Sequence, residues 1–315
     1  MTVKQALKEY FDITTNLQNT LKCGKFNENK LGEEEYLYHY TNDDGLYGIL
    51  KSGEFWFTET SALNDPSEEI YLRDSLIEAL RTTPLPNPRT AQLINEIQSN
   101  YSNFLSTEFK SYALCFSLHQ NDLTQWRSYA DDGHGYALRF KKRELLKAFY
   151  INKFEPNKSF SSFSMIYDPA RLSCAINQVS SALKATLDKI DALHESDQKK
   201  DSYVDVLALN SAIFISIIGT YFKHPCYDSE REVRFRIELT ERDLERKKGN
   251  KFVEYTKLNW RKSALDSLDQ IMIGPAASEL ESRKLVQSCL SYFGYKQKIA
   301  ITRSDLPYVS ERRIR

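Results

Sequence analysis

The spacing of hydrophobic and polar residues follows a helical period in some segments and alternates as in strands in others, and so predicts the helices and strands of the chain. Residues 1–22 and about 89–108 carry the spacing typical of helices, whereas short aromatic and aliphatic runs alternate as strands do. The strand-like runs are YLYHYT (36–41), EFWFTET (54–60), SYALCFSL (111–118), YALRF (136–140), SFSMIYD (162–168), EREVRFRIEL (230–239), NKFVEYT (250–256), LDQIMIGP (268–275) and QKIAIT (297–302).

Turn residues define the first element after the opening strand. Asn42 or Asp43 is expected to cap a helix over residues 44–53, and Gly53 stands where a helix C-cap is expected. The chain therefore opens its folded core with a strand, a helix and a strand.

Longer helical segments separate the two groups of strands. We expect helices from about Ser67 to Arg81 and from Arg89 to Glu108, and two more between Pro169 and Phe222, broken near residues 194–202. The most apolar run, residues 206–222, contains polar residues and is too short to cross a bilayer comfortably. It is interpreted as a buried core helix.

This order of elements predicts an α+β fold with a mixed sheet, because strands and helical blocks occur without strict alternation. We expect a helical lead-in over residues 1–35 and a single domain over 36–315, with helical segments at about 67–108 and 169–222. No GxGxxG or GxxxxGK[ST] motif follows a strand, so a Rossmann or P-loop nucleotide site has no support.

Composition limits the classes of function. Forty-three basic and forty-three acidic residues give a net charge of zero, so any contact with nucleic acid must be local. The five cysteines are widely spaced and contain no CxxC pair, which favours a reducing, cytoplasmic location. His119 and His134 have no partner at metal-binding spacing, and no metal is expected.

The strand near residue 232 carries the first candidate chemistry. Glu230, Glu232, Arg234 and Arg236 are expected to share one face of it, with the two carboxylates about 7 Å apart. Such a pair suits a site in which one acid stabilises a cationic transition state and the other orients a nucleophile. The alternative is ordinary charged decoration of a solvated sheet face.

Other candidates stand at strand ends and turns. His39 lies between two tyrosines on an aromatic strand, where it is either a ligand or a half-buried histidine bonded to backbone. Ser117 ends a strand, and His134 stands beside a glycine that permits close approach. Trp126, Arg127 and Tyr129 precede a sharp turn and either line a pocket or pack a short helix on the sheet.

Five motifs in order resemble the family catalogued as domain of unknown function 2971. They are YHYTNDDGLYGILKSGEFWFTETSALNDPSEE, LCFSL, WRSYADDGHGYALRF, SEREVRF and IMIGP, and the resemblance spans residues 36–302.

A second resemblance links the chain to the ADP-ribosyltransferase superfamily. It rests on a strand ending in His-x-Thr, the helix GLYGILKSG, an aromatic strand and a late strand with Glu-x-Glu. The resemblance implies a split, largely antiparallel sheet with inserted helices. It also implies that His39 holds the NAD ribose, Glu232 stabilises the oxocarbenium ion and Glu230 orients the target. Tyr47, Trp56, Thr60 and Ser117 compete for the role on the nicotinamide side.

The leading hypothesis is an enzyme that transfers ADP-ribose from NAD to a protein or nucleic acid, or hydrolyses NAD. Catalysis would require His39 and Glu232 to face one cleft, with NAD as substrate. The expected NAD-site residues are His39, Tyr40, Thr41, Trp56, Ser117, Arg127 and His134.

Two alternatives stay open. One is a non-catalytic module that binds a nucleotide or a protein in a stress or phage-defence system. The other is a nuclease or phosphate-transfer enzyme that uses His39, His134 and arginines. No membrane partner is expected.

Overall fold

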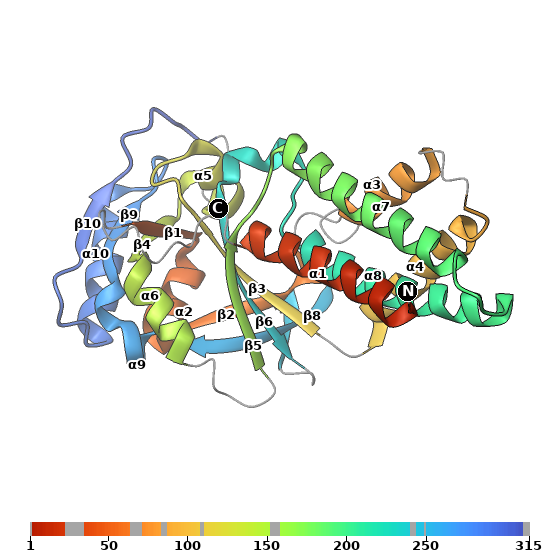
Figure 1. Ribbon diagram of the computed structural model, residues 1–315. Helices are drawn as coiled ribbons and strands as arrows, with labels where there is room; N and C mark the ends of the chain where they lie inside the picture. The colour runs from red at the N-terminus through yellow and green to blue at the C-terminus, as the bar shows by residue number, and fades with distance from the viewer. Residues whose placement is uncertain are drawn as a thin grey trace. The chain divides into compact units, whose positions relative to one another are not determined.

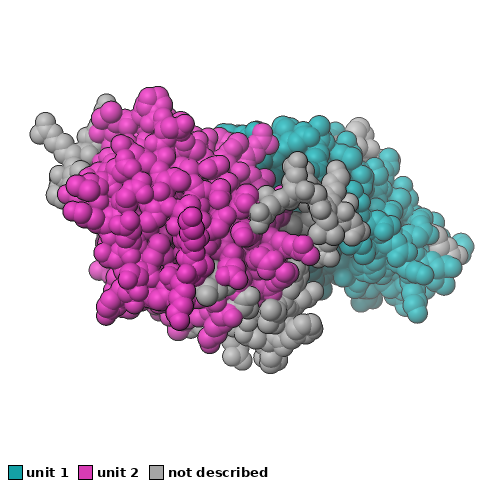
Figure 2. All heavy atoms as spheres, turned by 90° about the vertical axis from the view of Figure 1, so that its left-hand side faces the viewer, with its two compact units in different colours: residues 1–27, 63–109, 163–228 teal, residues 28–62, 110–162, 229–315 magenta. Residues whose placement is uncertain are grey.

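The computed structural model describes residues 2–22, 35–63, 71–82, 87–107, 110–151, 158–239, 244–248 and 250–310. The chain divides into two compact units, coloured in Figure 2. One unit combines residues 1–27, 63–109 and 163–228, and the other combines residues 28–62, 110–162 and 229–315. The predicted boundary at residue 35 and the single domain over 36–315 stay predictions.

The first unit is helical, and both predicted helical segments contribute to it. Its core is one cluster of aliphatic and aromatic side chains, and α4 packs along α8 as α1 does along α7. The hydroxyls of Tyr10 and Ser211 form a buried hydrogen bond of 2.8 Å. The helices, labelled in Figure 1, are α1 (Val3–Lys22), α3 (Tyr71–Thr82), α4 (Thr90–Thr107), α7 (Pro169–Asp191) and α8 (Asp197–Gly219).

The predicted break between two helices is confirmed, but it lies at residues 192–196, earlier than the predicted 194–202, since α7 ends at Asp191 and α8 begins at Asp197. The predicted helix start at Ser67 lies outside the described residues. Among those residues, α8 is long and apolar enough to cross a membrane by length and composition alone. Half of its most apolar window is buried within the structure.

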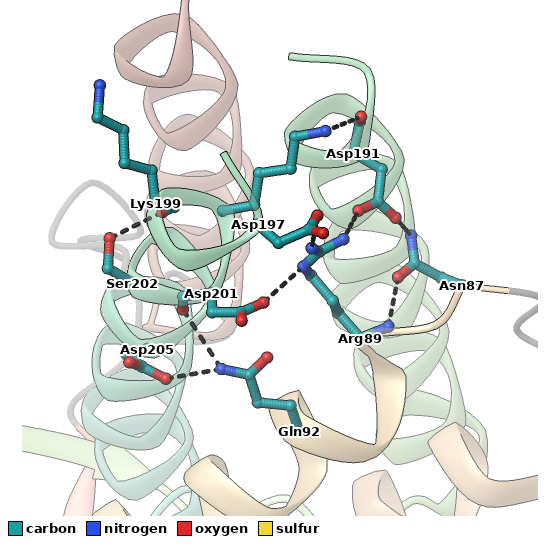
Figure 3. Close-up of polar contacts among 10 residues, drawn as sticks. Asn87, Arg89, Gln92, Asp191, Asp197, Lys199, Asp201, Ser202 and Asp205 are labelled. Carbon is teal, nitrogen blue, oxygen red and sulfur yellow. Dashed lines mark hydrogen bonds and ion pairs between the residues drawn. The ribbon is translucent and has the colours of Figure 1, made fainter. Parts of the chain in front are cut away.

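One arginine neutralises the acidic residues where α7 turns into α8. Arg89 contacts the carboxylates of Asp191, Asp197 and Asp201, the last two at 2.8 Å each (Figure 3). Asn87 donates a further hydrogen bond of 2.5 Å to Asp191. The side chain of Arg89 is only 13% exposed, so this network ties the start of α4 to the α7–α8 connection.

The second unit is built on a mixed sheet. The described residues form a ten-stranded sheet with the path β10-β9-β4-β1-β3-β2-β8-β7, and β6 pairs with β3 and with β5. Only β9 and β10 are parallel along this path, so the predicted α+β fold with a largely antiparallel sheet is confirmed. The strands are β1 (Tyr36–Thr41), β2 (Glu54–Glu59), β3 (Lys110–Ser117), β4 (Tyr136–Lys141), β5 (Lys158–Ser164), β6 (Glu232–Leu239), β7 (Leu244–Lys248), β8 (Lys251–Asn259), β9 (Leu268–Ile273) and β10 (Ala300–Arg303).

The sheet forks at β3. One edge of β3 pairs with β6 along residues 110–117, so β1 and β2 share the opposite edge. β1 joins this edge at Ser117, and β2 joins it at Tyr112 and Ala113. The β3 backbone between these positions therefore borders the opening between β1 and β2.

Helices and aromatic residues cover the two faces of the sheet. On one face, Phe149 of α6 packs on Phe57 and Phe235. On the other, Trp126 of α5 packs on Tyr40 with ring centroids 4.9 Å apart. The helices of this unit are α2 (Asp43–Ser52), α5 (Leu123–Tyr129), α6 (Lys142–Ile151), α9 (Arg261–Ala264) and α10 (Glu279–Tyr292).

The first predicted helix is confirmed with its caps. The Asn42 side chain accepts a hydrogen bond of 2.9 Å from the Gly45 backbone N–H, so Asn42 is the N-cap of α2. Gly53 adopts a φ of 65° at the C-terminal end, a conformation that favours glycine.

Candidate functional site

A row of side chains crosses three strands on one face of the sheet. The register pairs Tyr38 of β1 with Ser117 of β3, and Ser117 with Glu232 of β6. Residues paired in this way lie side by side on the same face. Tyr38, Ser117 and Glu232 are 7%, 3% and 5% exposed, so the row is buried.

Hydrogen bonds hold Glu230 next to this row. Ser117 Oγ donates to the Glu230 carbonyl at 2.8 Å and accepts from the His119 backbone N–H at 3.0 Å. The Tyr129 hydroxyl donates to Glu230 Oε1 at 2.7 Å. Ser117 thus connects the ends of β3 and β6, and Tyr129 fixes the carboxylate.

The expected position of Glu230 on the strand is wrong. Glu230 ends a 3₁₀ turn over Pro225–Glu230, and β6 begins only at Glu232. Between them Arg231 adopts a φ of 43°, which interrupts the strand alternation that would have placed both carboxylates on one strand face.

The shared face of Glu232, Arg234 and Arg236 is confirmed, but it is not solvated. Arg234 Nε lies 2.6 Å from Glu232 Oε1, and the two side chains are 2% and 5% exposed. Arg236 Nη2 lies 2.7 Å from Glu238 Oε1. The alternative of surface decoration is therefore wrong: these charges are buried and paired.

His39 faces the opposite side of the sheet from Glu232. It follows Tyr38 on β1, and neighbouring strand residues point to opposite faces. Its ring contacts Phe55 of β2 and Phe116 of β3, each with centroids 5.6 Å apart, so it lies at the fork of the sheet. The structure therefore does not bring His39 and Glu232 to a common cleft.

The contacts of His39 are those of a core histidine. Nδ1 lies 3.2 Å from the Cys115 carbonyl oxygen, which only accepts, so Nδ1 carries the proton. This carbonyl belongs to the β3 segment that borders the fork. Burial lowers the pKa of His39, although the bond to Cys115 opposes the shift, and the neutral form is favoured.

Tyr40 and Thr41 complete β1. The Tyr40 hydroxyl donates to the His119 carbonyl at 2.9 Å and accepts from the Asp122 backbone N–H at 3.3 Å. Burial raises the pKa of Tyr40. These bonds anchor α5 on the sheet. Thr41 is buried at the strand end, where its carbonyl leaves no room for a side chain at position 135.

Trp56 lies on the same face as Ser117 and Glu232 but is 43% exposed. The shared face follows from the register, which pairs Thr58 with Ala113 and Ala113 with Arg236. The Tyr255 ring lies 4.6 Å from the Trp56 ring, tilted by 30°. Of the other two competitors, Tyr47 is exposed and contacts Phe293, and Thr60 begins a 3₁₀ turn.

Arg127 and His134 flank a strained turn. The Arg127 side chain is 62% exposed, with Nε 3.6 Å from Asp132 Oδ1. His134 is partly buried, and its Nε2 has no hydrogen-bond partner among the described residues. Asp131 and Asp132 adopt positive φ angles of 47° and 53°.

Asp132 is central to this turn, although no sequence pattern selects it. Its carboxylate accepts hydrogen bonds from the hydroxyls of Tyr308, at 2.7 Å, and Ser310, at 2.5 Å. Both partners come from the C-terminal segment, more than 170 residues away. Only the dipeptide Asp131-Asp132 before a glycine marks the turn in the sequence.

Among the described residues, no group of three or more His, Cys, Asp or Glu side chains is placed to hold a metal ion. Cys115, Cys174, Cys226 and Cys289 are free thiols. The expectation of no metal stays a prediction.

Comparison with known proteins identifies a family over part of the chain. No curated protein and no solved structure matches it. The family match covers the chain from α5 to the first half of β6 and leaves out β1 with His39. It includes the candidate residues Arg127, His134, Glu230 and Glu232. The wider resemblance over 36–302 stays a prediction. Residues 125–235 match the family described as "Protein of unknown function (DUF2971)", as the motifs predicted.

Proposed function

We propose that the protein is an enzyme of ADP-ribosyltransferase type that takes NAD as substrate, centred on the row of Tyr38, Ser117 and Glu232. The supporting observation is the register of β3 and β6, which sets Ser117 beside Glu232. Glu232 is the late-strand glutamate that the resemblance implies, and Ser117 is one of the four residues that compete for the role on the nicotinamide side. Tyr38, not His39, occupies the early-strand place in this row, so the proposal gives up the requirement that His39 and Glu232 face one cleft and assigns no role to His39.

The chemistry needs a carboxylate beside the ribose. When the bond between ribose C1′ and the nicotinamide nitrogen breaks, its electron pair leaves with nicotinamide and positive charge develops on the ribose. Glu232, held by Arg234 at 2.6 Å, would stabilise that charge. The acceptor's nucleophile then bonds to C1′ and loses its proton to Glu230, which Tyr129 orients.

The test is release of nicotinamide from NAD by the purified full chain. Glu232→Gln should lower the rate at least about 100-fold, because a charge-stabilising group is lost at the transition state. Glu238→Gln is the matched control, on the same strand and the same face but near the opposite end of β6. An unchanged rate in Glu232→Gln refutes this site, and no release by the native protein refutes the class.

A second candidate is a non-catalytic nucleotide-binding module. The observation in its favour is that His39 and Glu232 lie on opposite faces of the sheet, so the pair that the resemblance implies for catalysis is not brought together. This function predicts that nucleotides raise the melting temperature without turnover, because a ligand that binds only the folded state stabilises it. NAD turnover with the Glu232 dependence described above excludes it.

A further inference from the structure

An aromatic and basic surface lies across β2, β8 and β7, and we call it the Trp56 surface. It consists of the exposed Trp56 and Lys257, the partly buried Arg246 and the Tyr255 ring beneath them, which is 8% exposed. The register pairs Trp56 with Lys257, and pairs Thr58 with Tyr255, so these side chains share one face of the three strands. Trp56 is 43% exposed, whereas the other two tryptophans, Trp126 and Trp260, are fully buried.

Both cations lie against both rings of this surface. The Arg246 guanidinium is 5.5 Å from the Trp56 ring centroid and 5.8 Å from that of Tyr255. Lys257 Nζ is 5.4 Å and 5.9 Å from the same centroids. Cations at these distances are attracted to the ring faces, and they border an exposed indole.

Arg246 lacks an acidic partner among the described residues. Its Nη2 donates to Thr58 Oγ1 at 2.9 Å, while its Nε is buried without a hydrogen-bond partner. Burial lowers the pKa of Arg246. A partly buried guanidinium without an anion is unfavourable, and an external phosphate beside it would supply the missing opposite charge.

We propose that the Trp56 surface binds single-stranded nucleic acid, with a base stacked on Trp56 and its flanking phosphates on Arg246 and Lys257. Stacking on exposed aromatic residues beside cations is the general mode of binding to single strands, including on the open face of a sheet. The chain has zero net charge, so this local pair of cations, rather than a global field, would hold the phosphates.

The proposal rests on Arg246 and Trp56 and on none of the residues of the Tyr38–Ser117–Glu232 row, so either proposal can fail without the other. A nucleic acid bound here would lie on the same face of the sheet as Glu232.

Tryptophan fluorescence tests the proposal directly, because Trp56 is the one tryptophan that solvent reaches. Titration of the full chain with oligo(dT) or oligo(rU) should quench the emission and saturate. With two phosphate contacts, raising salt from about 50 to 200 mM should weaken binding about sevenfold. Trp56→Phe should remove the quenching, and Trp56→Ala should weaken binding, followed by a labelled oligonucleotide, about tenfold.

Arg246→Met separates ligand binding from a structural role. Binding should fall at least tenfold while the melting temperature stays equal or rises, because an unpaired, partly buried charge is removed. Phe252→Ala and Lys247→Met are matched controls: both side chains are exposed on the same hairpin but point to the opposite face. Neither should change binding.

Three outcomes would overturn the proposal. The first is no quenching by any oligonucleotide at low salt. The second is an equal loss of binding in the Lys247→Met control, which would indicate unspecific charge attraction. The third is binding of NAD or a mononucleotide as tight as that of the oligonucleotide, which would assign the surface to a free nucleotide.

Discussion

Replacing His39 by glutamine distinguishes a core histidine from a ligand. Glutamine keeps a hydrogen-bond donor but loses the ring contacts with Phe55 and Phe116. Each edge-to-face contact contributes about 0.5–1.5 kcal/mol, and the bond to Cys115 contributes about 1 kcal/mol if glutamine fails to reach it. The expected loss is about 2–4 kcal/mol. At about 2–4 °C per kcal/mol, the melting temperature should fall by about 5–15 °C.

The pH dependence gives this prediction a second readout. The pKa of His39 in the folded protein is lowered from its ordinary value of 6.5. Below about pH 6.5 the unfolded chain therefore binds a proton that the folded protein does not, and stability is lost as the pH falls towards the folded pKa. His39→Gln lacks this loss, so its stability deficit should narrow between pH 7 and pH 5.

The assay is thermal unfolding followed by circular dichroism from pH 5 to pH 8, with nicotinamide release measured on the same samples. His119→Gln is the matched control, because the His119 side chain is exposed. A His39→Gln variant that melts like the native protein, with an unchanged pH profile, contradicts the core assignment. A variant that folds normally but loses activity would return His39 to the functional site.

Two further predictions concern stability, one in each unit. Arg89→Met should destabilise the helical unit by about 2–4 kcal/mol, because the carboxylate of Asp191, only 25% exposed, loses its charge partner. Urea unfolding measures the change in the free energy of unfolding. A change below about 0.5 kcal/mol contradicts the assigned network. Gly135→Ala should destabilise by about 3 kcal/mol or more, since a Cβ there would lie 2.2 Å from the Thr41 carbonyl oxygen. Gly48→Ala should instead stabilise by about 0.5–1 kcal/mol, because position 48 is an exposed helix position where an added Cβ meets nothing within 4 Å. Equal melting temperatures for the two glycine variants would refute the steric argument.

Elements with strong local signals were predictable from the sequence. The caps at Asn42 and Gly53 marked the bounds of α2, and the aromatic alternation marked β2 and β3. β7 escaped prediction because LERKK has no apolar alternation; its pairing with β8 makes it a strand. The positive φ of Arg231, which separates Glu230 from β6, also has no sequence signal, because arginine rarely adopts it.

The burial of charge on β6 could not be read from the sequence either. Arg234 and Glu232 alternate with Val233 and Phe235, a pattern that normally indicates one solvated face. In the structure both faces are buried, and the charges are tolerated because they pair within the strand. Such pairing depends on rotamers and on the covering layer, neither of which the local pattern encodes.

The face of His39 is the feature that pattern alone could not decide. β1 reads YLYHYT, with bulky residues at every position except the last, so hydrophobicity does not select which alternate set faces which side. A shift of one residue in the pairing with β3 would place His39 beside Ser117 and Glu232, and Tyr38 in the aromatic core. In the observed register the tyrosines make specific contacts instead. Tyr36 packs under the Arg139 guanidinium at 4.4 Å, and Tyr40 packs on Trp126 and bonds to the His119 carbonyl. The same contacts that anchor α5 therefore turn His39 away from the carboxylates, so the register of β1, rather than the histidine itself, determines which side chain stands beside Glu232.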